Sequence, residues 1–283
     1  MDCFEQLYGH ITSLSKDHFT YLPSEPPKNI LSRIPSELPP FLDNTPASIE
    51  LRSAYVQHII SKTLTHRIFQ PFLFTLGRRY DNADIFLQML SMDIRRKSTR
   101  REAFWRQQTL QAAYTAPDAK HTVNFAAGVI ADEIMDHIKY FADPDHLEAL
   151  RLDVRRAVKL AAEAWRHARV ERELILATLP APDAEGATNK DWKEYGRPKE
   201  GNSSSNNDPA RHVLLRTFPR ITRDEGYEDF AGDEGRRPPC TYSRGSVLYS
   251  DSPVVMARRQ EGWFESSSTI SVCGSAFALN QVV

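Results

Sequence analysis

Residues Asp145–Leu179 carry the strongest helical pattern of the chain and read DHLEALRLDVRRAVKLAAEAWRHARVERELILATL. Apolar residues recur there at steps of three and four, which is the period of an amphipathic α-helix. Asp143 suits the N-cap, Pro144 suits the first helical position, and Pro180 ends the pattern. A helix of this length extends for roughly 50 Å and needs a partner surface to be stable. We therefore expect one long helix against which the rest of the chain packs.

Similar helical patterns precede this segment. Thr45 is a good N-cap and Pro46 a good first residue for a helix that Pro71 should bend or end. A further helix is expected to begin at Asp81, and its apolar stripe consists of Ile85, Phe86, Met89, Leu90 and Met92. Other stripes cover residues 99–114, with a capping box at Thr99 and Glu102, and residues 123–141. The sequence therefore predicts an all-α fold, an irregular bundle of long amphipathic helices.

Composition divides the chain into six expected segments. These are a short docking helix (1–20), a Pro-rich linker (21–46), the helical bundle core (47–180), a mostly disordered linker with an acidic run (181–239), a short docking segment (240–263) and a flexible tail (264–283). Polar residues dominate after residue 180, and such segments bury too little apolar area to offset the entropy of ordering. We expect their short apolar islands to pack on the helical core; the alternative is that the islands bind another protein. Gly77 is expected to form a left-handed C-cap.

Charge and cysteine content exclude several protein classes. The formal net charge of −1 over 283 residues disfavours a general nucleic-acid coat. Cys3, Cys240 and Cys273 lie far apart, which predicts neither a disulfide framework nor a zinc module. There is no signal-peptide pattern and no apolar run long enough to span a bilayer. These features predict an intracellular protein, cytoplasmic or nuclear, that has no membrane partner.

Two stretches carry a resemblance to a known family. Residues 68–80 read IFQPFLFTLGRRY and residues 97–106 read KSTRREAFWR. They resemble an uncharacterised family of filamentous-fungal proteins over about half of the chain. The resemblance implies a fungal, intracellular setting and assigns no catalytic residue.

A basic segment lies between two of the expected helices. Its six cations are Arg95, Arg96, Lys97, Arg100, Arg101 and Arg106. With Phe104 and Trp105 beside them, they suit a phosphate backbone or an acidic protein partner, but acids of this chain are an alternative source of pairing. A second basic stripe follows the long helix through Arg151, Arg155, Lys159, Arg166 and Arg169.

Ser98 is a candidate phosphorylation site, because it follows the arginine-rich sequence that arginine-directed kinases recognise. A phosphate there would meet a helix N-terminus and nearby arginines. The alternative role for Ser98 is that of a capping residue without modification.

Among the spacings in this sequence, that of two aspartates on one helix most resembles an enzyme motif. Asp132 and Asp136 lie four residues apart with Glu133 between them, so they share one side of a helix and could hold Mg²⁺ for diphosphate chemistry, as in class I terpene synthases. The second metal-binding motif of those enzymes is missing, and a solvated acidic face explains the pattern equally. The pairs Asp118 with His121 and Asp143 with His146 are explained by helix capping.

The combined patterns favour a non-enzymatic interaction or scaffold protein that needs no cofactor. A magnesium-dependent helical enzyme acting through Asp132 and Asp136 is the first alternative, and a nucleic-acid-associated factor is the second. Phe104, Trp105 and Trp165 lie on apolar helical stripes and are expected in the core.

Overall fold

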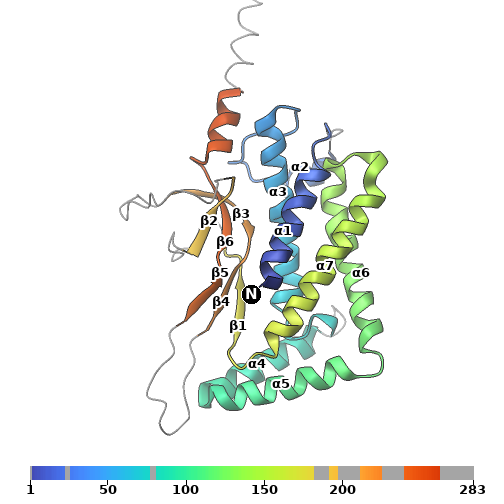
Figure 1. Ribbon diagram of the computed structural model, residues 1–283, viewed down its shortest axis with the longest axis vertical. Coiled ribbons are helices and arrows are strands. Elements are labelled where there is room, and N and C mark those ends of the chain that lie inside the picture. The colour runs from blue at the N-terminus through green and yellow to red at the C-terminus, as the bar shows by residue number, and fades with distance from the viewer. Residues whose placement is uncertain are drawn as a thin grey trace, which may run out of the picture.

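A helical layer and a β layer lie side by side in the computed structural model (Figure 1). The structure describes residues 2–22, 26–76, 81–181, 191–196, 211–224 and 239–261. The expected C-cap at Gly77, the flexible tail over 264–283 and Cys273 lie outside these residues. Six strands in two three-stranded sheets are present among the described residues, so the all-α prediction is wrong. Helices nevertheless form most of the fold, and the strands cover one side of it rather than its centre.

Four long helices form the main layer: α1 (Asp2–Asp17), α3 (Pro46–Leu64), α6 (Ala119–Ile138) and α7 (Leu147–Arg169). Thr45 caps α3, since its side chain accepts a hydrogen bond from the Ser48 amide. The core between these helices consists of side chains spaced three and four residues apart. Its fully or almost fully buried members include Leu7, Ile11, Leu51, Tyr55, Ile60, Ile134, Ile138, Val154, Val158 and Trp165.

Short helical turns join the long helices. They are α2 (Lys28–Leu31), η1 (Thr65–Phe69), η2 (Phe74–Leu76), η4 (Lys139–Phe141) and η5 (Pro144–His146). Helix α3 widens into the π-helical turn η1, where the Gln70 amide donates to the Thr65 carbonyl oxygen at 2.9 Å. The helix stops there because Pro71 has no amide hydrogen with which to continue it.

Helices α4 (Asp81–Lys97) and α5 (Thr99–Thr115) form an antiparallel hairpin across the lower end of the helical layer (Figure 1). The N-cap of α5 is Ser98 and not Thr99, because the Ser98 hydroxyl accepts a hydrogen bond from the Arg101 amide at 3.2 Å. The capping box expected at Thr99 and Glu102 is therefore wrong: the N-cap lies one residue earlier, and the residue three positions after it is Arg101, which cannot complete a capping box. Glu102 is buried and engaged elsewhere.

The β layer is a long hairpin bent in the middle. Strands β3 (Val213–Phe218) and β4 (Arg220–Arg223) lie in one arm, and β5 (Cys240–Ser243) and β6 (Gly245–Tyr249) in the other. Strand β1 (Ile175–Thr178) extends one half in the order β1-β4-β5, and β2 (Trp192–Glu194) extends the other in the order β2-β6-β3. A Cβ atom at Gly245 would overlap the indole ring of Trp192, so this close approach requires glycine.

The predicted long helix ends ten residues early, at Arg169. The Arg106 side chain donates hydrogen bonds to the carbonyl oxygens of Arg169, Glu171 (2.9 Å) and Arg172 (3.3 Å). In a longer helix these carbonyl oxygens would accept from backbone amides instead. Ile175 and Ala177 are then buried alternately, as in a strand, because β1 pairs with β4. Tertiary contacts thus override a helical pattern at its C-terminal end.

The β layer packs on α3 and shares the core of the helices. Leu214, Leu215 and Phe218 belong to the same buried cluster as Leu51 and Tyr55. The Ser61 hydroxyl donates to the Thr217 carbonyl oxygen at 2.7 Å across the contact. Strands β3 and β4 lie within the segment expected to be a mostly disordered linker, and β3 contains the apolar island of residues 213–218 that was expected to pack on the helical core. A final helix over residues 253–261 follows the hairpin.

Acidification is expected to weaken the contact between α3 and β3 through His58. The Nδ1–H group of His58 donates to the Arg216 carbonyl oxygen at 2.9 Å, and burial lowers the pKa of His58 from its ordinary value of 6.5. The unfolded chain therefore binds a proton where the folded chain does not. This contribution to stability is complete above pH 6.5 and is lost as the pH falls below it, by at most about 1.4 kcal/mol per pH unit.

Urea unfolding followed from about pH 8 to about pH 5 measures this effect. The matched variant is His58→Asn, which keeps an N–H donor but does not titrate. Its stability should depend less steeply on pH than that of the unchanged protein. Identical pH profiles for the two proteins would contradict the assignment to His58.

Candidate functional site

Helix α4 exposes a row of large apolar side chains, which we call the α4 apolar face. Its members are Ile85, Phe86, Met89 and Met92, and between 55% and 63% of each is exposed. Residues at these spacings share one side of a helix. Leaving such a side chain in water forgoes roughly 1.5–3 kcal/mol relative to burial. Contiguous exposed apolar side chains of this size are typical of an interaction surface.

The opposite side of α4 attaches the helix to the rest of the fold. The Asp84 carboxylate accepts a hydrogen bond from the Leu73 amide at 3.1 Å, and Leu87 packs against a small cluster that contains Phe72 and Leu110. This side of α4 is therefore attached to the fold by both a hydrogen bond and apolar packing. The most apolar side of the helix is left facing solvent, which is the reverse of the usual arrangement for a surface helix.

A buried ion pair fixes the hairpin to the end of α7. The Arg106 Nε donates to Glu102 Oε1 at 2.8 Å, and both side chains are fully buried. The Ser91 hydroxyl of α4 donates to the same carboxylate oxygen at 2.8 Å, so one carboxylate links α4 and α5. The α4 apolar face is therefore presented by a firmly anchored hairpin.

The structure separates the six basic residues of the predicted segment. Arg106 belongs to the buried pair just described, Arg95 contacts Asp224 at 3.0 Å, and Arg96 contacts Asp93 at 3.1 Å. Lys97, Arg100 and Arg101 are exposed at the junction of α4 and α5. Within the described part of the chain, no carboxylate lies within 4 Å of the side-chain nitrogens of Lys97 or Arg101. The α4 apolar face thus ends in a cationic junction.

The aromatic residues beside the basic segment have different environments. Phe104 is 65% exposed, so its predicted place in the core is wrong. Trp105 is partly buried, and its ring centroid lies 5.4 Å from that of Phe72. Trp165 is buried in the main core, as its helical position predicts. Periodicity could not distinguish these cases, because all three lie on apolar stripes.

Ser98 occupies the turn between α4 and α5. Its hydroxyl caps α5 by accepting from the Arg101 amide, which agrees with the capping role. The side chain is half-buried. A phosphate on Ser98 would replace this cap and would lie beside Arg101.

The basic residues along α7 also have different environments. Arg169 is buried, where its Nη2 donates to the Pro71 carbonyl oxygen at 2.9 Å and its guanidinium lies over the Trp165 ring. Arg151 contacts Asp132 of α6 at 3.7 Å. Arg155, Lys159 and Arg166 are exposed on α7.

The acidic face of α6 is occupied by cations of the same chain. Asp132 contacts Arg151, Glu133 contacts Arg67 at 3.0 Å, and Asp136 accepts a hydrogen bond from Lys139 at 2.9 Å. The Lys139 hydrogen bond is the main reason why the pKa of Asp136 is lowered. Across the residues that the structure describes, no group of three or more His, Cys, Asp or Glu side chains could hold a metal ion.

Of the two aspartates predicted to cap helices, Asp143 and Asp118, only Asp143 makes a side-chain capping hydrogen bond. Asp143 caps η5 by accepting from the Asp145 amide at 3.0 Å, and its second carboxylate oxygen contacts His146 Nδ1 at 2.8 Å. Asp118 stands at the N-cap of α6 without a side-chain capping hydrogen bond.

Comparison with protein-family models, curated proteins and solved structures finds no match to this chain. In the described ranges, no helix has both the length and the apolar character needed to cross a bilayer. The α4 apolar face was missed as a site in the sequence because its spacing is that of any core-facing stripe. Its one distinguishing signal is the basic run that directly follows it.

Proposed function

We propose that this chain is a non-enzymatic interaction protein whose α4–α5 hairpin docks an acidic amphipathic helix of a protein partner. The observation that carries the proposal is the exposed α4 apolar face. An amphipathic helix binds such a surface by placing its own apolar side chains against it. Two of the four exposed residues, Met89 and Met92, are flexible side chains that adapt to the shape of a partner.

The charge at the end of the face supports an acidic partner. Lys97 and Arg101 are exposed where α4 meets α5. The neighbouring Arg95 already contacts a carboxylate, that of Asp224, at 3.0 Å. Carboxylates along the polar side of a docked helix would pair with these cations, and such pairing directs orientation and specificity more than affinity.

Peptide binding to the full chain tests this proposal. The probe is a synthetic amphipathic helix with leucines on one side and glutamates on the other, and the comparison peptide replaces the glutamates with lysines. Fluorescence anisotropy should show binding of the acidic peptide only. We expect the variant Phe86→Ser with Met89→Ser to reduce the affinity by about tenfold or more, because it removes apolar contact area.

Leu152→Ser is the matched control, because Leu152 is 65% exposed on α7 and lies outside the hairpin. Its affinity for the acidic peptide should stay within about twofold of the unchanged protein. Binding that the double variant leaves unaltered would contradict the proposal. Salt-dependent binding of a random DNA duplex, without binding of the peptide, would instead favour the nucleic-acid alternative.

A further inference from the structure

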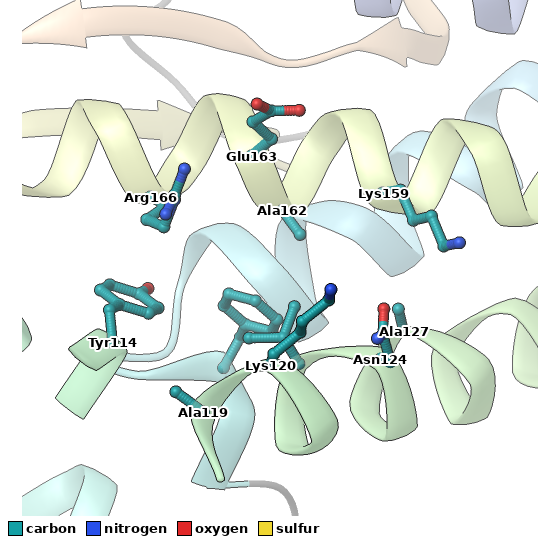
Figure 2. A pocket seen from close by; sticks show the side chains of 11 residues that line it. Tyr114, Ala119, Lys120, Asn124, Ala127, Lys159, Ala162, Glu163 and Arg166 are labelled. Atoms are coloured by element: carbon teal, nitrogen blue, oxygen red, sulfur yellow. The ribbon is translucent and has the colours of Figure 1, made fainter. Parts of the chain in front are cut away.

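A cavity of about 400 Å³ lies between α6 and α7, away from the α4 apolar face (Figure 2). Its apolar wall contains Phe74, Ala127 and Ala162, all of which are buried. Small alanine side chains on both helices leave the space that a larger residue would fill. The volume is within the range of small-molecule sites.

Cations surround the opening of this cavity. Lys120 extends from α6 toward α7, Lys159 extends from α7 toward α6, and Arg166 lies about two turns further along α7 (Figure 2). All three are exposed, and no carboxylate of the described residues lies within 4 Å of their side-chain nitrogens. Glu163 also lines the cavity, but its carboxylate points away from Lys120 in Figure 2. With three cations and one carboxylate lining it, the opening has a net positive charge.

A neutral hydrogen-bond donor, the Tyr114 hydroxyl, lies beside these cations. Tyr114 lines the cavity, and its hydroxyl, whose pKa burial raises to about 12, can donate to an anion. Ala119, the first residue of α6, lines the cavity as well. Its amide already donates to the Ala116 carbonyl oxygen at 2.9 Å, so Ala119 contributes wall surface and not a hydrogen-bond donor.

We propose that the α6–α7 cavity binds a free single-chain carboxylate with an apolar tail. The tail lies against Phe74, Ala127 and Ala162, and the carboxylate lies at the opening among Lys120, Lys159 and Arg166. Neither half of the site suffices alone. Exposed cations bind a small anion weakly in water, and the apolar wall by itself does not select for charge.

Isothermal titration of the full chain with decanoate, below its micelle concentration, tests this site. One decanoate should bind per chain, whereas acetate and decanol should each bind at least about tenfold more weakly. The variant Lys120→Glu with Lys159→Glu should reduce decanoate affinity by about tenfold or more, and the effect should shrink at high salt. Ala162→Phe, which fills the wall, should reduce it similarly while the circular dichroism spectrum stays unchanged.

The control is Lys28→Glu with Arg259→Glu, which makes the same change in net charge on exposed residues outside the cavity. Its affinity for decanoate should stay within about twofold of the unchanged protein. The proposal is overturned if the unchanged chain does not bind decanoate, if the lysine variant binds it equally well, or if acetate binds as tightly. Association with phosphatidylserine vesicles in the absence of decanoate binding also overturns it.

Discussion

Replacing Glu102 by alanine is expected to lower the free energy of unfolding by about 3–5 kcal/mol. Glu102 and Arg106 are both fully buried and lie 2.8 Å apart. Without the carboxylate, the Arg106 guanidinium keeps its charge in an apolar interior and retains only carbonyl oxygens as acceptors. The Ser91 hydroxyl loses its acceptor as well. Urea unfolding monitored by circular dichroism measures the loss.

An exposed ion pair in the same hairpin provides the control. Arg96 and Asp93 lie 3.1 Å apart on the surface of α4, and more than half of each side chain is exposed. Asp93→Ala should therefore cost no more than about 1 kcal/mol. If the two substitutions have equal effects, the buried pair does not anchor the hairpin. The Glu102→Ala protein should also bind the acidic peptide more weakly, since the α4 apolar face depends on that anchor.

Replacing Arg52 by methionine is expected to cost about 3 kcal/mol or more, because three buried carbonyl oxygens lose their donor. Arg52 is fully buried in α3. Its Nε donates to the Phe19 carbonyl oxygen at 2.8 Å, and its Nη1 donates to those of Phe41 (3.0 Å) and Asp43 (3.1 Å). These acceptors lie in the segments that connect α1 to α3. Methionine keeps the apolar stem of the side chain but ends at the position of Nε, so the effect combines the lost hydrogen bonds with the lost packing of the guanidinium group.

The same measurement on Lys16→Met separates this effect from the loss of a surface charge. Lys16 lies 3.9 Å from Glu50, and about half of its side chain is exposed. Its replacement should change stability by no more than about 0.5 kcal/mol. A comparably small effect of Arg52→Met would show that water or a local shift satisfies the three carbonyl groups.

The prediction of the candidate site from the sequence was incomplete for a physical reason. Six basic residues were grouped by their proximity along the chain, yet Arg106 is fully buried and Arg95 contacts Asp224, which lies 129 residues away. Charged residues are usually exposed, so nothing local indicates that Arg52 or Arg106 is buried. Their acceptors are backbone carbonyl groups of distant segments, which only the folded chain brings together.

The sequence by itself determined the positions of the main helices. Caps at Thr45 and Asp143 and the proline at position 71 act through groups a few residues away, so their effects can be read locally. Only the tertiary structure decided that residues 175–178 form a strand and that the apolar stripe of α4 faces solvent. Helical periodicity states which residues share a side of a helix, but whether that side is covered depends on segments far along the chain.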